Sequence, residues 1–378
     1  MTSEPRTPDL EEQEGDAHDE EMPRLRLTRR NLLLGLVFVV ATVAFLYYGL
    51  PQLADLDNTW KRLRAGDVWW LLGALIFTFC SFGGYVALFQ GVYVRRASRI
   101  DLRASYQITM ASLAATRVFA AGGAGGIALT AWALRRSGMS RREVADSTVA
   151  FLVLTYVVYM LALIVCGFGL RWDVLAGPAP WALTMLPALL GIVAIAVFLL
   201  MALVPTDVER RLRDWACDHD RPRLARIAQR LATVPAATSA GVREAIGHLR
   251  SRDPALVGSL AFWGFNIAVL WASFHAFGDP PPWGVLIMGY FVGMLGNLLP
   301  LPGGVGGVDG GMIGAFAAFG VDFGLATVAV LTYRGFAFWL PTIPGAIAYF
   351  QLRRTVSEWR EEPARGDVSV PAGCYYTK

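Results

Sequence analysis

A decapeptide dense in proline and glycine interrupts the apolar sequence in the C-terminal part of the chain. Residues 300–309 read Pro-Leu-Pro-Gly-Gly-Val-Gly-Gly-Val-Asp and separate two apolar runs. Proline and glycine break helices, and a break at membrane depth must be buried in protein or line a polar cavity, because lipid offers no hydrogen-bond partners. Such discontinuous helices often form transport sites. The candidate substrate-binding glycines are Gly303, Gly304, Gly306 and Gly307. The alternative is a glycine-rich packing kink with a tolerated acid.

The composition indicates a membrane protein. Of the 378 residues, 55% are hydrophobic and only 17% are charged, and the mean hydropathy is +0.44. These values are typical of an all-α polytopic membrane protein and disfavour a soluble globular domain. The four cysteines are far apart and show no paired spacing, so the sequence predicts no disulfide framework, no metal site and no cofactor.

Six apolar runs are long enough to cross a bilayer, which takes about 20 residues. They are residues 31–50, 68–94, 144–170, 181–204, 255–277 and 323–350. Arginine clusters precede the first run and follow the second and the last, and cytoplasmic segments are rich in arginine. With the scarcity of lysine and the abundance of alanine and glycine, the pattern predicts a multi-pass protein of a prokaryotic plasma (inner) membrane with both termini cytoplasmic.

The polar segments define the domain organisation. Residues 1–30 are first acidic and then basic, and are expected to form a disordered cytoplasmic tail. Residues 31–352 form the expected transmembrane domain. Within it, residues 205–254 form an arginine-rich cytoplasmic insert that either contacts anionic headgroups or is a solvated helical linker. Residues 353–378 are expected to form a second cytoplasmic tail.

Two further segments predict re-entrant helical hairpins. Residues 105–134 are interrupted by glycines and have cytoplasmic character at both ends, so one full span does not fit; two short tilted spans are the alternative. Because the last span must run from the outer side to the cytoplasm, and the span before residue 283 ends outside, residues 283–320 should begin and end on the outer side. The two hairpins would then be inverted, giving eight or more membrane segments and a site where they meet. The first hairpin contributes the candidate glycines Gly122, Gly123, Gly125 and Gly126.

Apart from Asp146 at the start of the run 144–170, three charged residues fall inside the expected membrane segments. Arg117 lies in the first hairpin and Arg334 in the last span, and each costs about 2.5–3.5 kcal/mol at a helix centre. An arginine can bind a lipid phosphate through two parallel hydrogen bonds. Equally, Asp309 could form a structural ion pair with Arg334 or Arg117, or cap a half-helix beginning near Gly310. Asn297 and Asn266 are candidate neutral hydrogen-bonding groups, although such residues often only join helices.

Two motifs carry a resemblance to a known family. The first is Pro-x-Pro-Gly-Gly-Val-Gly-Gly followed by an acid, and the second is the basic loop Leu-Arg-Arg-Ser-Gly-Met-Ser after a glycine-rich segment. Over about residues 30–355 the chain resembles the flippase-like membrane family typified by the transmembrane half of lysylphosphatidylglycerol synthase. The resemblance implies lipid translocation without synthesis, since no synthase-sized domain follows Phe350. The family usually has Glu at the position of Asp309, a change that keeps the charge and that the mechanism could tolerate. It usually also has a Gly-Glu pair where Gly126-Ile127 stands, and often a Glu-Arg pair near Ala150, so a mechanism requiring the acids of these two pairs is not expected here.

These features favour a lipid translocase for an anionic phospholipid or a polyprenyl-phosphate-linked lipid. The main alternative is a membrane scaffold or regulatory partner of a lipid or cell-envelope synthesis enzyme, recruited through the arginine-rich insert. A lipid-modifying enzyme is less favoured, because the sequence has no His/Asp/Glu cluster and no nucleophile beside a base. The expected partner is a membrane lipid and no nucleic acid, while an envelope-synthesis enzyme or a homo-oligomer stays open.

Overall fold

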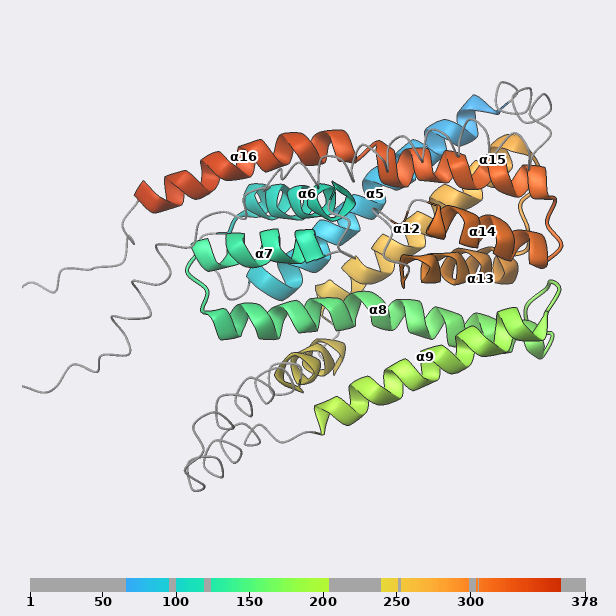
Figure 1. Ribbon diagram of the computed structural model, residues 1–378, viewed down its shortest axis with the longest axis horizontal. Coiled ribbons are helices and arrows are strands. Elements are labelled where there is room, and N and C mark those ends of the chain that lie inside the picture. Colours follow the sequence, from blue (N-terminus) through green and yellow to red (C-terminus); the bar gives the residue numbers. More distant parts are fainter. Residues whose placement is uncertain are drawn as a thin grey trace, which may run out of the picture.

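The computed structural model describes residues 66–94, 100–118, 124–203, 239–250, 253–298, 304 and 306–361. All regular elements in this part of the chain are helices, as predicted (Figure 1). The first predicted span, the N-terminal tail, most of the arginine-rich insert and the end of the C-terminal tail lie outside the described residues.

Five of the described helical segments are long and apolar enough to cross a membrane. Four are single helices: α5 (Val68–Tyr93), α8 (Arg141–Arg171), α9 (Trp181–Ala202) and α12 (Pro254–Phe277). The fifth segment runs from Phe323 to Trp359. These are the second to sixth predicted spans, and their helix ends follow local capping chemistry: Asp67, Ser140 and Asp253 accept hydrogen bonds from the first turns of α5, α8 and α12.

The last span differs from the single helix predicted over residues 323–350. It consists of α15 (Phe323–Arg334), a π-helical segment (Gly335–Trp339) and α16 (Thr342–Glu361). The Leu340 N–H donates to the Gly335 carbonyl at 2.9 Å, one residue beyond the α-helical partner. Pro341 explains the change of winding, because its ring has no N–H and clashes with the carbonyl four residues earlier.

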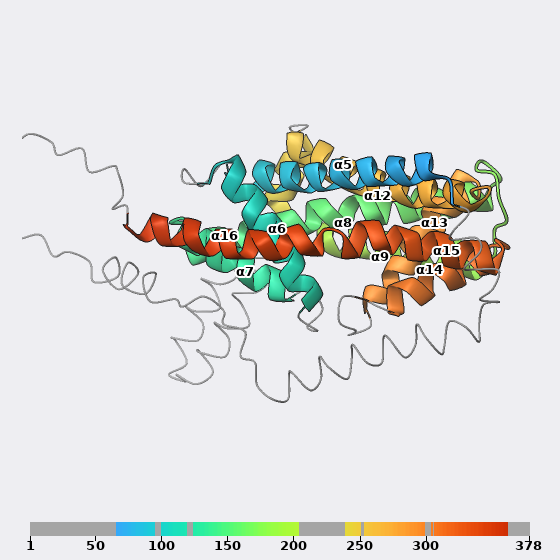
Figure 2. The same ribbon diagram turned by 90° about the horizontal axis from the view of Figure 1, so that it is seen from above.

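Helices α5 and α12 pack at close range along one side of the bundle (Figures 1 and 2). They are antiparallel, since the Asp67 N–H at the start of α5 donates to the Ala276 carbonyl at the end of α12. Two glycines allow the approach. A Cβ at Gly84 would lie 2.7 Å from the Phe262 nitrogen, and one at Gly258 would lie 2.5 Å from the Leu88 nitrogen. Small residues at such crossings let backbones pack closely.

Two pairs of short antiparallel helices lie on this scaffold, in opposite halves of the molecule (Figure 2). The first pair is α6 (Leu102–Val118) and α7 (Ala124–Arg136), joined by a hydrogen bond between Ser112 and Thr130 of 2.7 Å. The second pair is α13 (Trp283–Met294), which continues into a 3₁₀ turn (Leu295–Leu298), and α14 (Gly307–Ala318). The sequence predicted a helix break in each of these places.

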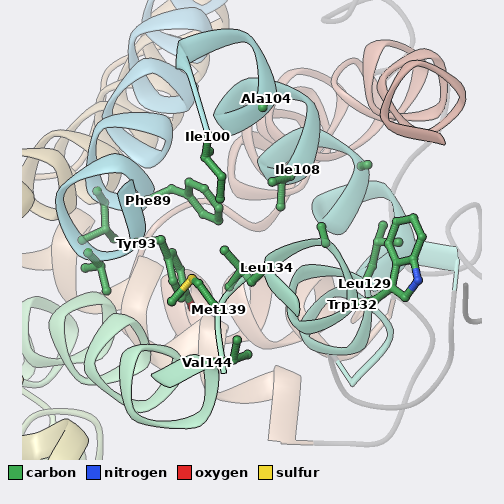
Figure 3. Close-up of a cluster of buried hydrophobic side chains, with 14 of the residues drawn as sticks. Phe89, Tyr93, Ile100, Ala104, Ile108, Leu129, Trp132, Leu134, Met139 and Val144 are labelled. Atoms are coloured by element: carbon green, nitrogen blue, oxygen red, sulfur yellow. The ribbon is translucent and has the colours of Figure 1, made fainter. Parts of the chain in front are cut away.

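Each short pair has its own hydrophobic core. The first core surrounds α6 and α7 and includes Phe89 of α5, Leu134 of α7 and Val144 of α8 (Figure 3), together with Leu352 of α16. The second core surrounds α13 and α14 and includes Leu163 of α8, Leu270 of α12 and Val330 of α15. The two halves of the last span therefore belong to different cores, and the junction between α15 and α16 lies between them.

Candidate functional site

Asp309 lies in the first turn of α14, at the inner end of the second helix pair. The helix begins at Gly307, directly after Gly306, whose φ of 82° is in the left-handed region that favours glycine. The Gly306 N–H donates to Oδ2 of Asp309 at 2.9 Å. The expectation that Asp309 is the N-cap of a helix beginning near Gly310 is therefore wrong: Asp309 is the third helical residue and reaches back to the cap, where its charge favours the helix N-terminus.

Arg334, the last residue of α15, forms an ion pair with Asp309. The Arg334 Nε lies 2.5 Å from Asp309 Oδ1, and the two side chains are 10% and 16% exposed. The contact lacks the N–H alignment of a regular hydrogen bond, so we describe it as an ion pair. The sequence offered Arg334 and Arg117 as partners for Asp309, and in the structure Asp309 pairs with Arg334.

The π-helical segment adds an aromatic contact to the same guanidinium. The Arg334 Cζ lies 4.3 Å from the centroid of the Phe338 ring, which is a cation–π distance. Sequence analysis missed Phe338 because an aromatic residue inside an expected regular span is indistinguishable from ordinary packing. The neighbouring Gly335 and Pro341 were the available signal of irregular winding.

Asn297 and Gly304 face each other across the inner end of the α13–α14 pair. Gly304 is buried with a φ of 65°, and a Cβ at this position would collide with the Asn297 side-chain oxygen. Asn297 is exposed and contacts Met294 Sδ at 3.5 Å. Gly307 lies against Gly296, where an added Cβ would meet the Gly307 carbonyl. The structure thus brings Asp309, Arg334 and the described glycines of the decapeptide to one region.

The first helix pair holds the remaining predicted residues. Gly125 is half-buried and Gly126 is buried in α7, where Gly126 packs against the Ser112 carbonyl of α6. Arg117 lies one residue before the end of α6, but its side chain is outside the described residues. Gly122, Gly123 and Gly303 also lie outside them, so a joint site of both pairs stays a prediction. The described residues hold no group of three or more His, Cys, Asp or Glu arranged to bind a metal ion.

Comparison with known proteins places this arrangement in a family. The family described as the lysylphosphatidylglycerol synthase TM region matches residues 32–345, a range that includes both short helix pairs and the Asp309–Arg334 ion pair. The chain belongs to this family. It is accordingly a multi-pass membrane protein, and the resemblance read from the decapeptide and the basic loop is confirmed.

Relatives named UPF0104 membrane proteins occur in Methanothermobacter thermautotrophicus. One is 24% identical over 343 residues, which is 86% of this chain and 96% of the relative. Two others match more locally, with 31% identity over 169 residues and 37% identity over 91 residues. The local matches cover 42% and 24% of this chain, and only 51% and 26% of those relatives. Their name describes a membrane protein and gives no activity.

Proposed function

We propose that this protein translocates an anionic phospholipid or a polyprenyl-phosphate-linked lipid between the leaflets of a prokaryotic plasma membrane. The observation that carries the proposal is the position of the Asp309 carboxylate. One of its oxygens accepts the N–H of Gly306 at the start of α14, and the other faces the Arg334 guanidinium. The carboxylate therefore occupies a position in which a helix N-terminus and an arginine both favour an anion.

A lipid phosphate suits the same two groups. Arginine can donate two parallel hydrogen bonds to phosphate, and free N–H groups at a helix N-terminus bind phosphate oxygens. In this mechanism Asp309 neutralises Arg334 when the site is empty, and the lipid phosphate replaces the carboxylate when the site is loaded. Exchange of one anion for another lowers the free-energy cost of moving a charged headgroup through the apolar core, because Arg334 is paired in both states.

The lengths of the short helices agree with a site near the bilayer centre. The helices α13, α14 and α15 have 12 residues each, so each is about 18 Å long at about 1.5 Å per residue. The hydrocarbon core is about 30 Å thick, so such a helix reaches past the midplane without crossing. Helices α13 and α15 begin at the end of the bundle where α12 ends, and this arrangement supports a mid-depth position of Arg334 and Asp309 in the proposed orientation.

The two short helix pairs are proposed to form the route along which the lipid headgroup moves between the leaflets. In the proposed topology, with both termini cytoplasmic, α6 and α7 enter as a re-entrant hairpin from the cytoplasmic face and α13 and α14 from the outer face. Inverted segments of this kind form the substrate sites of many secondary transporters. The layer between the two hydrophobic cores, where Arg334 and the π-helical segment lie, is the proposed passage for the headgroup.

Translocation can be measured in proteoliposomes that contain the purified full-length protein and a fluorescent phosphatidylglycerol. We expect Arg334→Ala and Asp309→Asn to lower the rate of phosphatidylglycerol movement at least tenfold. Asp322→Asn is the matched control, because Asp322 is an exposed acid that caps α15 away from the site. Unchanged rates in both site variants, with correct insertion, would contradict the proposal. Loss of a cellular phenotype on deletion of residues 205–238 alone would instead support the scaffold alternative.

A further inference from the structure

A chain of buried side-chain hydrogen bonds passes through Tyr333, the residue next to Arg334. The Tyr333 hydroxyl donates to the Asn266 side-chain oxygen at 3.2 Å and lies 3.1 Å from the Tyr290 hydroxyl. The Asn266 amide donates to the Ser81 hydroxyl at 2.6 Å and to the Phe262 carbonyl at 2.9 Å. The chain thus connects α13, α15, α12 and α5 through four buried residues.

Such a chain is not needed merely to satisfy a buried tyrosine hydroxyl. Tyr159, which is also buried, donates to the backbone carbonyl of Phe291 at 2.6 Å and joins only two helices. Tyr333 instead connects α15 to both α12 and α13 through side chains. Because side-chain partners constrain one another's rotamers, the Tyr333 ring is fixed relative to three helices.

From this geometry we infer that Tyr333, held by Asn266 and Tyr290, is a positioning residue that sets the direction of the Arg334 guanidinium. Successive residues on an α-helix point about 100° apart, so anchoring Tyr333 fixes the rotation of the last turn of α15. The anchor is needed at this point because the winding changes at Gly335.

The inference rests on the proposed exchange of Asp309 for a lipid phosphate, and it explains how the exchange can occur. When the carboxylate leaves, Arg334 loses its ion-pair partner on α14. The tyrosine chain and the Phe338 ring do not involve Asp309, so both contacts persist. The guanidinium then stays preformed for the incoming anion, which avoids the entropic cost of ordering it during binding.

The structural part of the inference can be tested without any lipid. Hydrogen–deuterium exchange is measured on the detergent-solubilised full-length protein and its Tyr333→Phe and Tyr159→Phe variants. We expect Tyr333→Phe to speed amide exchange at residues 335–340 at least tenfold, and Tyr159→Phe to leave these residues unchanged. Equal protection in Tyr333→Phe and the unmodified protein would overturn the inference, whatever the outcome of transport assays.

The functional part is tested by the concentration dependence of phosphatidylglycerol translocation. We expect Tyr333→Phe to raise the half-saturating mole fraction of phosphatidylglycerol about fivefold, the change expected from one lost neutral hydrogen bond, with the maximal rate within twofold. Tyr290→Phe should cause a smaller increase because the Tyr333–Asn266 bond remains. The inference is wrong if Tyr159→Phe shifts half-saturation as much as Tyr333→Phe. If the unmodified protein moves no phosphatidylglycerol, the proposed function fails for this lipid, while the exchange measurement still decides the positioning role.

Discussion

At the scale of single residues, the buried charge pair dominates. Arg334 and Asp309 are both largely removed from solvent, and each compensates the charge of the other. A buried pair is weak evidence for stability in itself, but removal of one partner leaves an uncompensated charge. The pair therefore makes the two residues interdependent, whether or not a lipid binds.

We expect Arg334→Met to destabilise the protein by about 3–5 kcal/mol, because Asp309 then stays buried without a counter-charge. The double variant Arg334→Met with Asp309→Asn should recover most of this loss. Denaturant unfolding in detergent measures both. The matched control is Arg353→Met on α16, where the side chain is exposed and little change is expected. Equal losses in the single and double variants would argue against energetic coupling of the pair.

Arg334→Lys separates charge from shape. Lysine keeps the positive charge, but it lacks the planar fork that binds phosphate through two hydrogen bonds and stacks on an aromatic ring such as Phe338. We expect stability close to that of the unmodified protein and a rise of about tenfold in half-saturating phosphatidylglycerol in the translocation assay. An unchanged half-saturation would mean that charge alone suffices at this position.

At the scale of helices, the crossing of α5 and α12 depends on glycines, among them Gly84 and Gly258. A Cβ at Gly258 would meet backbone atoms of α5, which cannot move aside as a flexible side chain can. We expect Gly258→Ala to destabilise the protein by about 1–3 kcal/mol through overpacking. Gly264 is on the same helix, with open space around its Cβ position, so Gly264→Ala should be neutral or slightly stabilising. Thermal unfolding in detergent compares the two, and equal midpoints would contradict the close crossing.

The helix breaks show what sequence can predict about elements. The decapeptide and the Gly122–Gly126 cluster concentrate proline and glycine, which break or weaken a helix, so both short pairs were predictable. The break in the last span was missed because its residues are apolar throughout and its signals, Gly335 and Pro341, are isolated.

Arg334 and Asp309 were found because charges are rare in apolar segments, but sequence left open which arginine Asp309 would meet. Tyr333 and Tyr290 gave no signal, since a buried tyrosine matches an apolar pattern until its hydroxyl partners are known.

At the scale of the whole molecule, the proposed entry of the two helix pairs from opposite membrane faces can be tested by its topology. Arg142 is in the first turn of α8 and Asp279 is between α12 and α13, and both are exposed. The start of α8 and the end of α12 lie at opposite ends of the bundle (Figure 1). In a background without native cysteines, we expect a membrane-impermeant maleimide to label Asp279→Cys from the outside and Arg142→Cys only in inverted vesicles. Labelling of both from one side would rule out the inverted arrangement.

The division of the last span between two hydrophobic cores has a mechanical consequence. Helix α15 is embedded in one core and α16 in the other, and residues 335–341, which begin with the π-helical segment Gly335–Trp339, join them. If one core tilts against the other, the bend falls on this short stretch and therefore directly beside the Arg334 side chain. The span would then bend beside the buried ion pair, so that a tilt of α16 would change the orientation of α15 at the opposite end of the span.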